Sequence, residues 1–106
     1  MAQGESKLSR DIMEAMRLEG WFCFKAHGNE FMMAGLPDII CCADGLFVGL
    51  ETKKPEARNK EDAHVRNQKR VQAKIRAAGG CSQPVTSVEE AIEVVELALR
   101  RRRLKS

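Results

Sequence analysis

The stretch Gly35-Leu36-Pro37-Asp38 and the triplet Glu51-Thr52-Lys53 bracket the part of the chain that decides its fold. Between them, two apolar runs are separated by Asp44-Gly45, a dipeptide typical of tight turns between antiparallel strands. We therefore expect a hairpin with strands at 38–43 and 46–53. Because both runs are apolar nearly throughout, we expect the hairpin to be buried on both faces of a sheet.

The segments on either side of the hairpin complete an α/β pattern. Apolar side chains recur at helical spacing over 6–19, 61–78 and 87–99, which predicts three helices. Apolar runs at 21–26 and 81–86 predict two further strands. The expected order is α-β-β-β-α-β-α, a mixed β-sheet flanked by helices.

One domain accounts for residues 1–106, because the chain contains no internal repeat and is short for two cores. Pro84 lacks a backbone N–H, which favours an edge position for its strand. The sequence Ser87-Val-Glu-Glu90 is a capping box that opens the last helix. Residues 100–106, which include the run Arg100–Arg103, are expected to form a frayed basic tail.

Composition argues against several classes of protein. No apolar run approaches the roughly 20 residues that span a membrane, and the N-terminal residues lack the apolar core of a signal peptide. The four cysteines include no C-x-x-C pair, which argues against a zinc site and a disulfide framework. We therefore expect a cytoplasmic protein whose cysteines are mostly small buried hydrophobic residues.

Two acidic residues and a lysine carry the expected chemistry. Asp38 stands at the mouth of one hairpin strand, and Glu51 and Lys53 leave the other strand from the same face. Carboxylate oxygens bind hard divalent cations such as Mg²⁺, which in turn bind phosphate substrates. Either acid alone could be a surface residue, but an acid at the end of a buried strand needs a cation or hydrogen-bonding partners. The set predicts a metal site that hydrolyses a phosphodiester.

The basic residues are unevenly distributed, although the net charge is only +3. Arg66, Lys69 and Arg70 lie close together on one predicted helix, and Lys25 ends a strand near the edge expected for Asp38. Local positive potential of this kind attracts phosphates, so these four residues are candidates for nucleic-acid binding. The aromatic residues are expected in the core; they are Trp21, Phe22, Phe24, Phe31 and Phe47.

Taken together, Gly35-Leu-Pro-Asp38 and Glu51-Thr-Lys53 resemble the signature of the PD-(D/E)XK nuclease superfamily. The downstream segments Val65-Arg-Asn-Gln-Lys-Arg70 and Ala77-Ala-Gly-Gly80 resemble more specifically its VRR-NUC branch. The similarity covers nearly the whole chain, starting at Glu5. It implies a restriction-endonuclease-like fold.

The resemblance implies a role for each matching residue. Asp38 and Glu51 would bind Mg²⁺ or Mn²⁺, with the backbone carbonyl of Thr52 as a third ligand. Lys53 would position or activate the attacking water and offset the charge that builds on the phosphate. Gln68 would reach from its helix towards Lys53 or the scissile phosphate.

The first helix is expected to add one acid, as it often does in this family. Glu5 and Ser9 lie four residues apart on the core-facing side of that helix, whereas Glu14 lies roughly opposite. Glu5 is therefore the candidate, and Ser9 occupies the other position at which the acid could stand.

The function implied by the resemblance is a Mg²⁺- or Mn²⁺-dependent endonuclease that selects DNA by its structure. Small stand-alone members, typical of phage and bacterial genomes, form homodimers and act on branched DNA. A homodimer acting on Holliday-junction-type DNA, in a bacterial cell or a phage-infected host, is therefore expected. The alternatives are a flap or single-strand nuclease, a non-catalytic nucleic-acid-binding protein on the same fold, and a small structural domain.

Overall fold

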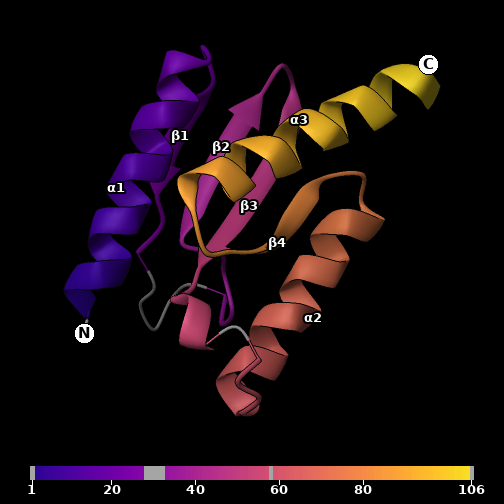
Figure 1. Cartoon of the computed structure of the whole chain (residues 1–106). Coiled ribbons are helices and arrows are strands. Elements are labelled where there is room, and N and C mark those ends of the chain that lie inside the picture. Colours follow the sequence, from indigo (N-terminus) through magenta and orange to yellow (C-terminus); the bar gives the residue numbers. More distant parts are fainter. Residues whose placement is uncertain (1, 28–32, 58, 106) are drawn as a thin grey trace.

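The computed structural model describes residues 2–27, 33–57 and 59–105, with side chains from Lys7 onward. Within these ranges the chain forms one four-stranded sheet, three α-helices and a 3₁₀-helix (Figure 1). The helices are α1 (Ala2–Leu18), η1 (Pro55–Ala57), α2 (Ala63–Ala77) and α3 (Val88–Lys105), and the strands are β1 (Phe22–Lys25), β2 (Ile39–Ala43), β3 (Leu46–Thr52) and β4 (Cys81–Val85).

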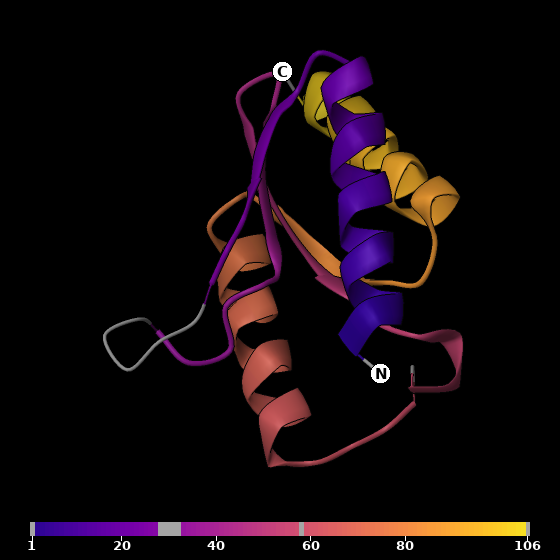
Figure 2. The same cartoon turned by 90° about the vertical axis from the view of Figure 1, so that its left-hand side faces the viewer.

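The sheet is mixed, with the strand order β1-β2-β3-β4. Neighbouring strands are antiparallel from β1 to β3, whereas β4 runs parallel to β3 because α2 carries the chain back across the sheet. Figure 2 shows α1 and α3 on one face of the sheet and α2 on the other. The element order and the layers confirm the predicted α/β fold. No helix in the described ranges is both long and apolar enough to cross a membrane.

The turn between β2 and β3 fixes the register of the hairpin. Asp44 and Gly45 both have positive φ, 52° and 83°, as a two-residue hairpin turn requires. The register pairs Ile39 with Leu50, and its continuation by one residue brings Asp38 opposite the residue that follows Leu50, which is Glu51. Because a slip by one residue would turn these side chains to the other face, the turn determines where the two acids lie.

The hydrophobic core lies between the sheet and the layer formed by α1 and α3. Alternate residues of the strands point into it, and the helices supply the side chains that pack against them. Its fully buried members include Ile12, Met16, Ile39, Val48, Leu50, Val85 and Val95.

Three aromatic residues expected in the core are instead exposed. Phe22, Phe24 and Phe47 are exposed by 69%, 47% and 47%, whereas Trp21 is buried as predicted. Strand alternation turns the three phenylalanines to the face that carries α2, and α2 packs on β4, so no helix of the described residues covers the β1 side of that face. Phe31 lies outside the described residues.

The last helix is longer than predicted. It continues through the basic run to Lys105 instead of ending at Leu99, so the prediction of a frayed tail is wrong. Basic side chains at the carboxyl end of a helix interact favourably with its dipole. In addition, Arg102 Nη1 donates a hydrogen bond to the carbonyl of Asp44 at 3.1 Å, which ties the helix to the hairpin turn.

The cysteines differ in accessibility, which predicts their reactivity. Cys42 is exposed and the other three are buried. Burial, together with a smaller effect of the neighbouring thiols, raises the pKa of the Cys41 thiol from the ordinary 9.0 to about 12. Because only the thiolate reacts, we expect a thiol reagent at pH 8 to modify one cysteine quickly in the native protein and four in denaturant. Cys42→Ser should remove the rapidly modified thiol. Rapid modification of a thiol in this variant would contradict the assignment of the reactive cysteine to Cys42.

Candidate active site

The motif Gly35-Leu-Pro-Asp38 is built for close packing at the entrance to β2. A Cβ added to Gly35, whose φ is +87°, would lie 2.8 Å from the backbone oxygen of Asn67 in α2. A Cβ added to Gly49 of β3 would lie 2.7 Å from the ring of Pro37. The chain therefore enters β2 pressed against both α2 and β3, and this packing presents Asp38 at the mouth of the strand.

Thr52 holds the side chain of Asp38. The backbone N–H and the hydroxyl of Thr52 donate hydrogen bonds to Asp38 Oδ2 at 2.9 and 2.7 Å. The N–H of Ala26 donates to the backbone carbonyl of Asp38 at 2.7 Å. Both bonds from Thr52 reach the same carboxylate oxygen, so Oδ1 takes part in neither of them.

Ser9 and Lys25 extend this network to α1 and β1. The Ser9 hydroxyl donates to Thr52 Oγ1 at 3.3 Å, and Lys25 Nζ donates to Ser9 Oγ at 3.0 Å. Ser9 is 1% exposed, so its polar contacts lie inside the protein. Ser9, the other position at which the first-helix acid could stand, therefore brings a hydroxyl rather than an acid to Thr52. The side chain of Glu5 lies outside the described residues, and Glu14 is exposed.

Gln68 joins the second acid to the lysine. Its Nε2 donates to Glu51 Oε2 at 2.7 Å, and its Oε1 accepts from Lys53 Nζ at 2.8 Å. Glu51 and Gln68 are 5% and 4% exposed, and a buried carboxylate requires such hydrogen bonds. Gln68 therefore reaches both Lys53 and Glu51, and the structure brings the three residues together.

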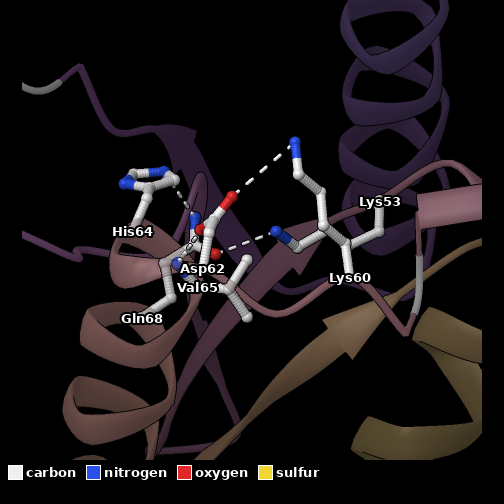
Figure 3. Close-up of polar contacts among 6 residues, drawn as sticks. All are labelled: Lys53, Lys60, Asp62, His64, Val65 and Gln68. Atoms are coloured by element: carbon white, nitrogen blue, oxygen red, sulfur yellow. Dashed lines mark hydrogen bonds and ion pairs between the residues drawn. The ribbon is translucent and has the colours of Figure 1, made fainter.

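His64 is a site residue that the sequence analysis missed. Its Nε2 lies 3.1 Å from Gln68 Nε2, one turn earlier on α2 (Figure 3). The available signal was its spacing of four residues from Gln68, which places both side chains on one helix face. Asp62 caps this end of α2 by accepting from the N–H of Val65 at 2.8 Å. That hydrogen bond lowers the pKa of Asp62, and the cap fixes the turn from which His64 and Gln68 project.

The basic residues predicted on α2 are all exposed, and one of them adjoins the site. Lys69 lines a small cavity that it shares with Lys53 and Gln68, and it pairs with Glu61 at 2.6 Å. Arg66 and Arg70 do not line this cavity.

The donor atoms fit a magnesium-type ion better than zinc. The described residues contain no group of three His, Cys, Asp or Glu side chains that could hold a metal. Asp38, which immediately precedes β2, and Glu51 of β3 carry hard carboxylate oxygens. Mg²⁺ commonly uses one or two carboxylates and completes its shell with water and substrate phosphate. Two carboxylates are the kind of ligand that Mg²⁺ or Mn²⁺ takes from a protein, whereas a structural zinc site needs four closed ligands.

No family model and no curated protein matches the sequence. Solved structures that share its fold include the following two. One is described as a VRR_NUC domain, with a TM-score of 0.68 and 23% identity, covering 88% of this chain and 95% of the other. The second is Archaeoglobus fulgidus Hjc, a Holliday junction resolvase from an archaeal hyperthermophile, with a TM-score of 0.54 and 15% identity, covering 77% of this chain and 67% of the other.

These similarities define the class of fold. The chain has a nuclease fold of the restriction-endonuclease-like type. Within that class its fold is that of a VRR-NUC domain, as the resemblance in the sequence implied. At these levels of identity the comparisons establish the fold, and the chemistry must be argued from the residues of this chain.

Proposed function

We propose that the protein is a Mg²⁺- or Mn²⁺-dependent endodeoxyribonuclease that cleaves branched DNA of the Holliday-junction type. The observations that carry the proposal are the hydrogen bonds that hold Asp38 on Thr52, the residue next to Glu51, and those that join Lys53 to Glu51 through Gln68. A structural domain has no need for two such acids and a positioned lysine. The resolvase among the similar folds supports DNA as the substrate.

Asp38 and Glu51 would hold the metal ion together with the backbone carbonyl of Thr52. When bound, the ion lowers the pKa of a coordinated water and neutralises charge on the phosphate. The two hydrogen bonds from Thr52 keep the Asp38 carboxylate oriented before any ligand arrives. Ser9 and Lys25 support Thr52 from the other side.

Lys53 would act on the attacking water or on a non-bridging oxygen of the phosphate. Its ammonium carries donors that favour negative charge as it develops in the transition state. Gln68 holds the ammonium at 2.8 Å and Glu51 at 2.7 Å, so it sets the position of the lysine relative to the acid. Gln68 is therefore proposed as a positioning residue.

Cleavage assays on four substrates test the proposal. A labelled four-way junction, a flap, a duplex and a single strand would each be incubated with Mg²⁺, with Mn²⁺ and with EDTA. We expect metal-dependent cutting, fastest on the junction. Faster cutting of the flap or single strand would favour that alternative substrate. Tight DNA binding without cutting of any substrate would favour the non-catalytic binding protein.

Metal binding is also expected to stabilise the fold. An ion that binds only the native state raises the free energy of unfolding by RT ln(1 + [L]/Kd), so the melting temperature should rise steadily with Mg²⁺ or Mn²⁺ concentration. Differential scanning fluorimetry at constant ionic strength would measure the shift. Glu61→Gln removes a surface acid as a control and should leave the shift intact. A melting temperature independent of both ions would argue against the metal site.

We further propose that the protein forms a homodimer through the β1 side of the sheet face that carries α2. Phe22, Phe24 and Phe47 expose an apolar patch on this face, and Phe47 also lines an apolar groove of 360 Å³. Contiguous exposed apolar surface is typical of an interface, and a two-fold dimer would present two active sites for paired cuts.

Phe24→Glu is expected to convert this dimer into a monomer, because a charge would be buried at the centre of the interface. Light scattering should then report the chain mass of 11.9 kDa in place of twice that mass. Leu18→Glu is the matched control, since Leu18 is 83% exposed on α1, away from the patch. A wild-type protein that is monomeric at assay concentrations would contradict the homodimer.

A further inference from the structure

The outer edge of β4 is bordered by basic side chains from two helices. β4 is the edge strand of the sheet and lies between α2 and α3 (Figure 1). Near the candidate site, the small cavity that contains Pro84 is lined by Lys53, Lys60 and Lys69. At the opposite end of β4, a cavity of 430 Å³ includes residues 81–83. The cations that line this distal cavity are Arg76 from α2 and Arg101, Arg102 and Lys105 from α3.

α2 contributes a cation to each cavity, Lys69 to the one near the site and Arg76 to the distal one. Lys69 and Arg76 are seven residues apart, so they lie on the same face of α2, about 10 Å apart along its axis. Consecutive phosphates of one DNA strand advance about 3.4 Å along the duplex axis. The distance from Lys69 to Arg76 along α2 therefore corresponds to about three nucleotides of one strand.

Arg76 of the distal cavity is held by a neutral group. Its Nη1 donates to the carbonyl of Ser82 at 2.7 Å. Such bonds fix a guanidinium without cancelling its charge. Within the described parts of the chain, the salt bridges involve other lysines and none includes Arg76, Arg101 or Lys105.

Helix dipoles do not explain this arrangement alone. The dipole of a helix favours basic residues at the carboxyl end of that same helix. It does not account for basic side chains of two helices, α2 and α3, that line the same cavity. The positive potential of these cations is felt at Cys81, which lines the distal cavity. Burial raises the pKa of Cys81, and Arg101 and Arg76 act in the opposite direction with a smaller effect. Pro84 has no backbone N–H that could pair with a further strand. The addition of another strand beside β4 is therefore unfavourable.

We propose that this border of β4 is a track for the DNA backbone, along which phosphates leaving the site beside Lys53 continue to the distal cavity at Arg76, Arg101 and Lys105. The inference rests on the proposed nuclease function and adds to it the surface that holds the DNA beyond the cut. Each phosphate contact releases counterions, so the track predicts a measurable salt dependence.

Two double variants of α3 with equal charge test the track. Arg101→Gln/Lys105→Gln removes two cations from the distal cavity, whereas Arg100→Gln/Arg103→Gln removes two that do not line it. All four side chains are exposed, so both proteins should fold and melt like the wild type. Affinity for a fluorescent four-way junction would be measured by anisotropy in EDTA over a series of KCl concentrations.

A plot of log K against log[salt] has a negative slope. The first variant is expected to make this slope shallower by about 1.8, the value for two lost phosphate contacts, and the second variant by well under half of that. Equal slopes in the two variants, or no change in the first, would overturn the track. Should the first variant melt early, Arg101→Gln alone is expected to make the slope shallower by about 0.9.

Binding in EDTA separates this proposal from the nuclease. Salt slopes as expected, without cleavage under Mg²⁺ or Mn²⁺, would overturn the nuclease and retain the track. Cleavage with equal slopes would overturn the track alone. A wild-type protein that binds no DNA would overturn both.

Discussion

Asp38→Asn is expected to lower the rate of metal-dependent DNA cleavage by about 10³-fold while the protein stays folded. Thr52 donates two hydrogen bonds to Asp38 Oδ2, and only the amide oxygen of an asparagine can accept them. The amide NH₂ must then take the place of Oδ1. The variant therefore keeps the shape of the side chain but presents hydrogens where a cation needs a lone pair.

Single-turnover cleavage of the preferred substrate would measure this loss, with melting temperature as the check on folding. Asp11→Asn is the matched control, because it removes the same charge from an exposed residue of α1 that pairs with Lys7. We expect the control to cleave at the wild-type rate. If Asp38→Asn retained more than a tenth of the wild-type rate, Asp38 would not be a metal ligand.

The relative placement of the two acids was predictable because local signals determine it. Asp44-Gly45 specifies a two-residue turn, and the turn sets the register that brings Asp38 opposite Glu51. Gln68 followed from the resemblance, and the structure brings it to Lys53 and Glu51. Features that depend on a turn and on strand alternation are encoded within a few residues.

The support for Asp38 could not be predicted in the same way. Ser9 meets Thr52 across 43 positions of the sequence, and the contact depends on how α1 lies across the sheet. The ring of Pro37 against Gly49 likewise depends on the packing of the chain before β2. Helical spacing reveals which face of α1 is buried but not which strand residue it meets.

The exposed aromatic face shows a second limit of pattern reasoning. The alternation of Phe22 and Phe24 around buried Cys23 predicts two faces of a strand, but it does not say which face a helix will cover. α2 is placed by the crossover from β3 to β4, so the β1 side of that face remains without a helix in the described parts of the chain. Exposure of aromatic residues is thus a consequence of topology, and it motivates the proposed dimer.

Lys53→Ala is expected to lower the cleavage rate by about 10³-fold, or about 4 kcal/mol of transition-state stabilisation, with little change in DNA affinity. A charge that acts on the reacting phosphate contributes mainly in the transition state, whereas affinity is spread over many phosphate contacts. The ammonium of Lys53 is held by Gln68 at 2.8 Å, and Gln68 in turn donates to Glu51 at 2.7 Å. Gln68→Ala should therefore also slow cleavage, but less, because the ammonium remains and only its position is released.

Lys54→Ala is the matched control for this variant. Lys54 is the next residue along the chain and carries the same charge, but no site hydrogen bond. Single-turnover rates and anisotropy in EDTA would be compared for the two variants. We expect Lys54→Ala to cleave at nearly the wild-type rate and Lys53→Ala to bind but not cleave. Equal losses in both variants would mean that the lysine contributes only general positive charge, and the chemical step would then belong to the metal-bound water and the acids alone.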